Sequence, residues 1–364
     1  MPSAKTRKPL TYKSSGIDLQ RYDGFIATLE TVLRRTHGPR VISNPGGFGG
    51  LFRLDYNEDL FQRNYADPVL VACADGVGTK IRIAQALQRY DTIGIDLVAM
   101  NVNDLVVEGA EPLFFLDIIS VNHVDQAVMD PLVRGIARGC EIAGCALLGG
   151  ETAEMGDLYQ PGDFDVNGFA LGVVELKKAV SRRKTKPGDI VLGLESDGVH
   201  SNGYTLVRNI VKTARLDLQR TYPQLATEDD PSPTLGEVLI KPTRIYADSV
   251  VRLLRAYRVK KVVTAMAHVT GGGLADNLAR TLTDDVDAKL DRSAWPVPPI
   301  FDLLQQKGNV TGDEMAKVFN MGIGYVIVVR PAFADAVADR LRRSGERVHK
   351  IGRLVKGAGR VKIS

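Results

Sequence analysis

The stretch KKAVSRRKTKPGD, residues 177–189, divides the chain into two halves that both alternate strand and helix patterns. It is polar and basic, it ends in Pro-Gly-Asp, and the apolar run IVLGLESDG follows it directly. Turn residues after a charged run are typical of a connection between structured units, and a short apolar run bounded by them is typical of a buried strand. We therefore predict an α/β (α+β) fold with two domains, residues 18–178 and 187–364, after a flexible tail of residues 1–17.

Each half carries its own series of strand and helix patterns. In the first half, strands are predicted at PVLVACAD (68–75), LFFLDIISV (113–121), CALLGGET (145–152) and GFALGVVEL (168–176), with helices at 18–36, 79–89, 92–108 and 125–143. In the second half, strands are predicted near 261–267, 318–329 and 348–355, with helices near 202–214, 235–257 and 332–344. No internal sequence repeat is visible, so a solenoid is excluded.

Composition excludes several classes of protein. The 364 residues are 44% hydrophobic, and the net charge of +4 is spread along the chain, so we expect no nucleic-acid partner. No apolar run reaches the ~18 residues of a membrane span, so no membrane partner is expected either. The three cysteines, Cys73, Cys140 and Cys145, show no metal-binding spacing, which favours a reducing compartment and a cytoplasmic location.

The segment DGVGTK, residues 75–80, resembles the end of a phosphate-binding loop but lacks the Walker A spacing, because Cys73 stands where its first glycine belongs. Asp75 ends a strand of the buried type, glycines follow that let a backbone approach a ligand, and Lys80 could meet a negative charge. This predicts a ligand site. The alternative is that Asp75 forms an Asx turn that caps the next helix.

The helix predicted at 92–108 is apolar almost all round, which predicts that it is buried. Asp96, Asn103 and Asp104 nevertheless fall within about 100° of arc on it. A buried carboxylate must meet a donor or a metal ion, because burial of an unpaired charge is costly. A metal site and an internal network with Arg or Lys both remain open.

A third acid, Glu151, follows a buried strand and two glycines in LLGGETAEM. Asp75, Asp104 and Glu151 are hard oxygen ligands beside glycine-rich segments, a combination that suits Mg²⁺ carrying nucleotide phosphates. The glycine-rich NPGGFGG, residues 44–50, could cover such phosphates with its backbone N–H groups, although surface loops have the same composition.

Two glycine-containing junctions precede helices in the second half. SDGVHSNGYTLVR (196–208) passes through Ser201, Asn202 and Gly203 into a helix, where exposed N–H groups could bind an anion. AHVTGGGLADN (267–277) repeats the pattern. His200 and His268 lie beside these junctions and could transfer a proton near neutral pH, or each could serve a structural hydrogen bond.

Five ordered stretches, DGVGTK, IGIDLVAMNVNDLVVEGAEPLFFLD, LLGGETAEM, GVHSNGY and HVTGGG, resemble the phosphoribosylformylglycinamidine cyclo-ligases, also called aminoimidazole ribonucleotide synthetases. The resemblance runs from about Tyr12 to about Ile363. It implies two α/β domains, with the N-terminal domains of two chains pairing through a β-barrel-like sheet into a homodimer. It also implies ATP-dependent ring closure of formylglycinamidine ribonucleotide in purine biosynthesis, with release of ADP and phosphate.

The resemblance also implies roles for particular residues. Asp75, Asp104 and Glu151 would hold Mg²⁺; Ser201, Asn202 and Gly203 would hold the substrate phosphate; His268, His200 and Lys80 are the catalytic candidates. The residues implied to bind Mg²⁺-ATP are Gly46, Gly47, Phe48, Gly49, Asp75, Gly76, Thr79, Lys80, Asn103, Asp104, Glu151 and Thr152.

Two alternatives to this function remain. The chain could be a related ATP-dependent kinase or synthetase of the same superfamily, although selenophosphate synthesis is disfavoured because no cysteine lies near the 44–50 loop. It could also be a nucleotide-binding regulatory subunit without turnover. Retention of the three acids, Lys80 and both histidines favours an enzyme.

Overall fold

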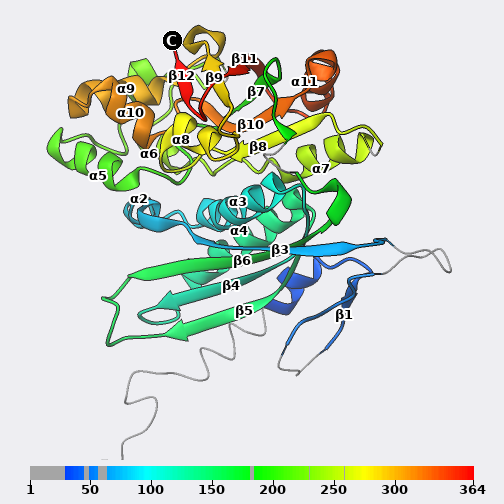
Figure 1. The fold of residues 1–364 in the computed structure, drawn as a ribbon. Helices are drawn as coiled ribbons and strands as arrows, with labels where there is room; N and C mark the ends of the chain where they lie inside the picture. Colours follow the sequence, from blue (N-terminus) through cyan, green and yellow to red (C-terminus); the bar gives the residue numbers. More distant parts are fainter. Residues whose placement is uncertain (1–28, 45–48, 56–63, 181–183, 229, 258) are drawn as a thin grey trace, which may run out of the picture.

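The structure, a computed structural model, describes residues 29–44, 49–55, 64–180, 184–228, 230–257 and 259–364. Two units, each a sheet with helices, lie one above the other (Figure 1). Helices α3 (Asp91–Val107) and α4 (Gln126–Ala143) lie between the lower sheet and the upper unit. The predicted class of mixed helix and sheet is confirmed.

The lower unit contains a four-stranded sheet in the order β3-β6-β4-β5. Its strands are β3 (Pro68–Gly76), β4 (Glu111–Val121), β5 (Ala146–Glu154) and β6 (Phe164–Glu175). Strand β6 is antiparallel to β3 and β4, whereas β5 is parallel to β4. Successive side chains of a strand point to opposite faces. Val69 and Val71 therefore pack against the core below the helices, while Leu70 between them is 52% exposed on the other face.

The contact between α3 and α4 depends on two glycines. A Cβ at Gly135 of α4 would lie 1.9 Å from the carbonyl oxygen of Asp91, and a Cβ at Gly94 of α3 would lie 2.3 Å from the backbone nitrogen of Ile136. No larger residue fits at this separation of the two backbones. Helix α3 is buried almost all round, as its sequence predicts.

The upper unit contains a six-stranded sheet in the order β12-β9-β11-β7-β10-β8. Its strands are β7 (Ile190–Glu195), β8 (Val263–His268), β9 (Val286–Leu290), β10 (Ile323–Val329), β11 (Val348–Lys356) and β12 (Val361–Ile363). All neighbours are antiparallel except β12 and β9. Its helices are α5 (Tyr204–Thr213), α6 (Leu235–Ile240), α7 (Ala247–Ala256), α8 (Gly273–Ala279), α9 (Pro299–Gly308), α10 (Gly312–Val318) and α11 (Ala334–Arg343).

The prediction of one helix over 235–257 is wrong. Helix α6 begins at a capping box between Thr234 and Glu237 and ends at Ile240, and α7 begins at Ala247. Pro242 lies between them, and proline in a helix interior removes a hydrogen bond and clashes with the preceding turn. The non-helical segment 241–246 contributes backbone groups to the contact between the two units.

The smaller elements are β1 (Val41–Ile42), β2 (Leu51–Phe52), the 3-10 helix η2 (Gly78–Lys80) and α2 (Ile81–Leu87). Residues 29–34 are helical, whereas the rest of the helix predicted for 18–36 lies mostly outside the described residues. Within the described part of the chain, no helix has the length and apolarity needed to cross a membrane.

Candidate active site

A cavity of about 470 Å³ lies where the end of β3 meets the start of α5, between the two units. Its lining includes residues predicted for the site from both halves of the sequence, namely Asp75, Gly76, Thr79, Ser201, Asn202 and Gly203. It also includes Val77, Gly78, Met100, Asp165, Asn167, Tyr204 and Thr205. The structure therefore brings the DGVGTK segment and the SNG segment to one site.

Asp75 contributes a carboxylate at the end of β3, and this carboxylate accepts a hydrogen bond of 2.8 Å from the N–H of Gly76. No side chain caps η2 or α2, so the Asx turn proposed as the alternative for Asp75 is not formed. Partial burial raises the pKa of Asp75; the charge of Asp104 raises it further, while that of His268 lowers it. Two carboxylates within electrostatic range form a site that favours a cation.

Asp104 joins the two units through His268. The side chain of Asp104, on α3, is 46% exposed, and its Oδ1 lies 2.8 Å from Nδ1 of His268 at the end of β8. The side chain of His268 is only 2% exposed, and its Nε2 lies 3.5 Å from the side-chain nitrogen of Asn103. The buried His268 therefore holds the partly exposed Asp104 in position, and His268 itself does not line the cavity.

Lys80 does not face the cavity, contrary to its predicted phosphate-binding role. Its side chain is fully buried, and its ammonium lies 2.8 Å from Asp96 and donates to the carbonyl oxygen of Lys241 at 2.5 Å. Burial lowers the pKa of Lys80, while the charge of Asp96 raises it. The expected contact with nucleotide phosphates is thus replaced by a buried ion pair. For Asp96, the internal network is the arrangement that the structure shows.

The same network includes Ser201, whose hydroxyl donates to Asp96 at 2.9 Å. The backbone N–H and the hydroxyl of Thr243 also donate to Asp96, each at 2.6 Å. The hydroxyl of Ser201 is consequently directed into the contact between the units. An anion at this junction would have to use backbone N–H groups and Asn202. Gly203 precedes α5 with φ of 78°, which glycine adopts without strain.

His200 is buried within the upper unit and not exposed to the cavity. Its Nε2 accepts hydrogen bonds from the N–H of Asp197 at 3.1 Å and of Arg244 at 3.4 Å. Burial lowers the pKa of His200 well below its ordinary value, and nearby positive charges lower it further. The geometry supports the structural alternative for His200: a neutral ring that orders two backbone segments.

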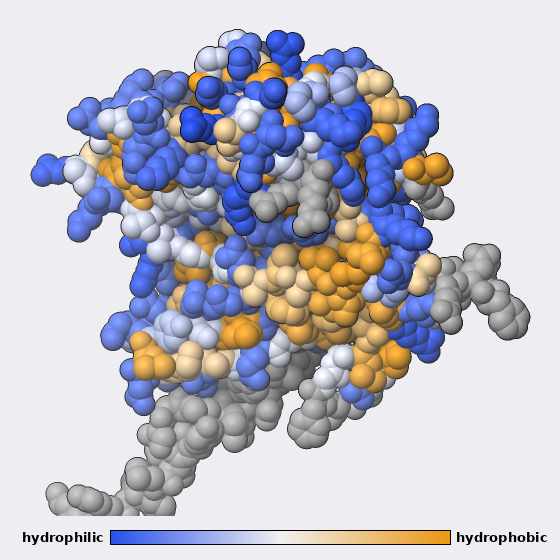
Figure 2. All heavy atoms as spheres, viewed as in Figure 1, coloured by the Kyte–Doolittle hydropathy of each residue, from blue (hydrophilic) through white to orange (hydrophobic). Residues whose placement is uncertain are grey.

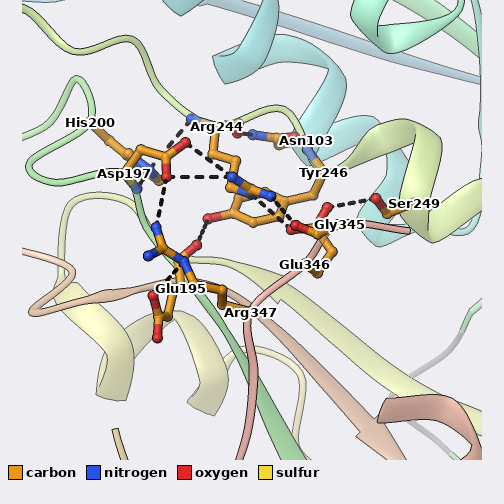
Figure 3. A network of polar contacts seen from close by, with 10 residues as sticks. All are labelled: Asn103, Glu195, Asp197, His200, Arg244, Tyr246, Ser249, Gly345, Glu346 and Arg347. Atoms are coloured by element: carbon orange, nitrogen blue, oxygen red, sulfur yellow. Dashed lines mark hydrogen bonds and ion pairs between the residues drawn. The ribbon is translucent and has the colours of Figure 1, made fainter. Parts of the chain in front are cut away.

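Arg244 is the centre of the network drawn in Figure 3. Its guanidinium contacts Asp197 at 3.2 Å and Glu346 at 2.8 Å. The side chain of Asn103, on α3 of the lower unit, donates to the carbonyl oxygen of Arg244 at 2.8 Å and accepts from the N–H of Tyr246 at 2.9 Å. Asn103, predicted to bind nucleotide, is therefore fully buried and joins the two units.

Asp75 and Glu151 lie on the two opposite edge strands of the lower sheet, β3 and β5. Gly76 pairs with Asn167, Asn167 with Ile118, and Ile118 with Glu151, so three strand spacings, about 14 Å, separate β3 from β5 in this row. Among the described residues, no group of three or more His, Cys, Asp or Glu side chains could hold a metal ion. Within one chain, the predicted trio of Asp75, Asp104 and Glu151 is not assembled.

The remaining predicted nucleotide contacts fall elsewhere. Thr152 is buried in β5, and Gly49 is exposed, its carbonyl accepting a hydrogen bond of 2.9 Å from the side chain of Asn44. Gly46, Gly47 and Phe48 lie outside the described residues.

Sequence reasoning missed Asp165 and Asn167, which line the cavity from β6. The side-chain amide of Asn167 donates to Asp165 at 3.2 Å. Both belong to FDVNG, where polar residues alternate with Phe164 and Val166, and this alternation was a signal that they share the open face. Their proximity to Asp75 arises from the pairing of β3 with β6, which the sequence does not specify.

Comparison with solved structures shows which known proteins share this fold. The chain resembles thiamine-monophosphate kinase from Stenotrophomonas maltophilia with a TM-score of 0.65 at 19% identity, covering 93% of this chain and 95% of that one. It resembles hydrogenase maturation protein HypE, in a complex with ATP, with a TM-score of 0.63 at 17% identity, covering 96% and 92% of the two chains. At these identities the likeness concerns the fold.

Sequence comparison is more specific. Residues 63–174 and 186–364 match the family models described as AIR synthase related protein, N-terminal domain and C-terminal domain. The chain is 45% identical over 350 residues to phosphoribosylformylglycinamidine cyclo-ligase of Paraburkholderia phymatum, covering 96% of this chain and 93% of that protein. It is 45% identical over 349 residues to the enzyme of the same name from Geobacillus sp. WCH70, covering 96% of each. The chain belongs to the phosphoribosylformylglycinamidine cyclo-ligase family.

Proposed function

We propose that this chain closes the imidazole ring of formylglycinamidine ribonucleotide, consuming ATP and releasing ADP and phosphate, to give 5-aminoimidazole ribonucleotide. The observation that carries the proposal is the cavity between the two units, where the Asp75 carboxylate and a glycine-rich turn face the start of α5. Membership of the cyclo-ligase family over nearly the whole chain supports it.

The reaction needs an activated oxygen. The γ-phosphoryl group of ATP passes to the formyl amide oxygen, which turns that oxygen into a good leaving group. The amidine nitrogen then attacks the same carbon, the C–O bond breaks with departure of phosphate, and the nitrogen loses a proton. Such a transfer depends on positioning and charge neutralisation, so the protein must hold both substrates in one closed site.

The described residues suit these tasks in part. Residues 77–79 follow β3 directly and line the cavity, a position in which their backbone N–H groups would suit phosphate oxygens. Asn202 and the backbone at the start of α5 would hold the phosphate of the ribonucleotide on the opposite wall. Asp104, held by His268 at 2.8 Å, lies within electrostatic range of Asp75 but is not among the residues that line the cavity.

A magnesium ion fits the donors that face the cavity. Asp75 and Asp165 supply carboxylates, and Thr79 supplies a hydroxyl. Burial and the charge of Asp104 both raise the pKa of Asp75, so a cation bound at this wall would stabilise its ionised carboxylate. Mg²⁺ usually takes one or two protein carboxylates and completes its shell with phosphate oxygens and water. When bound, it would neutralise charge on the transferred phosphoryl group.

We also propose a homodimer formed through the open face of the lower sheet. Leu70, Ile118 and Phe169 are exposed there by 52%, 52% and 39%, and Figure 2 shows an apolar area over these strands. Contiguous apolar surface of this kind usually marks an interface.

The three cysteines are free, which agrees with a reducing compartment such as the cytoplasm.

The proposed active site is tested by replacing Asp75 with Asn. We expect kcat/KM for the aminoimidazole product to fall at least about 100-fold, because a charge that positions the metal and phosphates is lost. Asp67→Asn, at an exposed position just before the same strand, is the matched control and should keep wild-type turnover. Equal turnover in the Asp75 variant and the control would remove Asp75 from the site.

A further inference from the structure

A second cavity lies at the opposite end of the β3–β6 pair from the candidate active site. Its volume is about 670 Å³, and none of its described lining residues lines the first cavity. Strand β6 connects the two, with Asn167 at one and Glu175 at the other, eight residues or about 26 Å apart along the strand. Helix α7 lies above this end of the sheet (Figure 1). The volume is in the range of sites for small molecules.

The lining of this second cavity is strongly basic. It contains seven lysine and arginine side chains and two glutamates. Both glutamates are engaged locally: Glu111 pairs with Arg255 at 2.7 Å, and Glu175 accepts the N–H groups of Ala66 and Asp67 at 2.9 and 2.8 Å. Little negative charge is left to neutralise the lysines.

Several of these lysines have no acidic partner. Among the described residues, no acidic side chain forms an ion pair with Lys177, Lys178, Lys260 or Lys261. Lys184 donates to the carbonyl oxygen of Ala179 at 2.9 Å, again not to an acid. Burial lowers the pKa of Lys184, and the charge of Lys261 lowers it further, so these two ammonium groups lie within electrostatic range. An anion between them would relieve this repulsion.

Part of the wall is apolar. It includes the rings of Tyr65 and Tyr257. The aliphatic residues of the wall are Val173, Val174, Val251, Leu254, Val262 and Val263. A cavity lined by both basic and apolar side chains matches a ligand with a charged group and an apolar body.

We propose that this second cavity binds a small phosphorylated molecule, with its phosphate between Lys184 and Lys261 and a ring against the aliphatic wall. Phosphate is favoured because the lining holds seven basic side chains against two engaged glutamates, so an anion there gains from several positive charges. The site is separate from the proposed active site, and its existence does not depend on the cyclo-ligase reaction.

The test uses phenyl phosphate as the probe, titrated calorimetrically into the full chain at low ionic strength. The pocket variant is Lys184→Gln with Lys261→Gln. The matched control is Lys307→Gln with Lys317→Gln, two exposed lysines on α9 and α10. We expect the dissociation constant to rise at least tenfold in the pocket variant and to stay within twofold of wild type in the control. Lys260→Gln with Lys261→Gln replaces the pocket variant if Lys184 proves necessary for folding.

Two further probes separate the possible ligands. Inorganic phosphate should bind at least tenfold more weakly than phenyl phosphate, because it buries no ring against the valines. Wild-type affinity in the pocket variant, or no binding of phenyl phosphate to the wild-type chain, would overturn the proposal. Displacement of phenyl phosphate by a decaglutamate peptide at lower concentration than by phosphate would overturn it as well, in favour of an acidic protein segment.

Discussion

At the residue scale, the buried pair of Lys80 and Asp96 in the lower unit has the largest consequences, because both partners also bind the upper unit. Lys80 donates to the carbonyl oxygen of Lys241, and Asp96 accepts from Ser201 and Thr243. Removing one member of such a pair typically costs about 3–5 kcal/mol, since the other charge is left buried. We predict a loss of this size in the free energy of unfolding of Lys80→Met, measured by denaturant titration.

The double variant Lys80→Met/Asp96→Asn is the control for that prediction. It should recover part of the loss, because no charge is then left without a partner. A stable Lys80→Met protein with a greatly raised KM for ATP would show instead that Lys80 serves the nucleotide, as its sequence context predicts.

The residue-scale prediction from sequence failed at Lys80 for a physical reason. A lysine after a glycine-rich turn is typical of a phosphate-binding residue. Its partner Asp96 lies in a nearby helix, but a buried aspartate in a sequence can equally be a metal ligand. Asp75 and Thr79 line the cavity because the strand end fixes their position, and their role in binding nucleotide stays a prediction. The position of Asp165 in the cavity depends on how β6 pairs with β3, and a pairing between strands so far apart in the sequence could not be predicted from it.

His200 gives a prediction about pH. Its pKa in the folded chain is far below 6.5, so the ring stays neutral while the unfolded chain takes up a proton below that pH. Stability is therefore lost as pH falls below about 6.5, by about 1.4 kcal/mol per pH unit from this group.

His200→Asn should reduce proton uptake on unfolding at pH 5.5 by about one proton, measured by the pH dependence of denaturant unfolding. Asparagine tolerates the left-handed backbone at this position, where φ is 66°, and can still accept the two N–H groups. An unchanged slope would mean that His200 is protonated in the folded chain.

At the element scale, the close contact of α3 and α4 sets the position of the helix that carries Asp104. We predict that Gly135→Ala destabilises the chain by about 1–3 kcal/mol, because the added methyl would overlap the carbonyl oxygen of Asp91. Gly312→Ala in α10 is the control, with nothing nearer than 3.9 Å to its added methyl, and should leave stability unchanged or raise it by up to about 1 kcal/mol. Thermal unfolding of both variants checks this, and equal midpoints would contradict a tight contact.

Elements with strong periodicity were predictable and interrupted ones were not. The buried helix α3 and the amphipathic α4 lie within about a residue of their predicted ranges. The break between α6 and α7 was missed because apolar residues continue at helical spacing through Pro242. That break matters for the site, since Thr243 and Arg244 within it bind residues of the lower unit.

At the scale of the whole molecule, the sequence predicted two α/β units and the family, while the packing that forms the cavity came from the structure. The prediction at this scale concerns the open face of the lower sheet, through which we propose that two chains form a dimer. We expect light scattering to give twice the mass of the chain, and Leu70→Lys/Ile118→Lys to give a monomer, because charges on that face cannot be buried in an interface.

Ile363→Lys, on β12 of the upper sheet, is the control and should remain dimeric. A wild-type monomer, or a dimer that survives the double substitution, would exclude this face as the interface.

The central claim is tested most directly by phosphate release from ATP and Mg²⁺ with and without formylglycinamidine ribonucleotide, while the aminoimidazole product is followed in the same samples. The account predicts one phosphate per aminoimidazole ribonucleotide and negligible release without the ribonucleotide. Release that does not depend on that substrate, or no release with it, would contradict the cyclo-ligase function and leave the fold assignment intact.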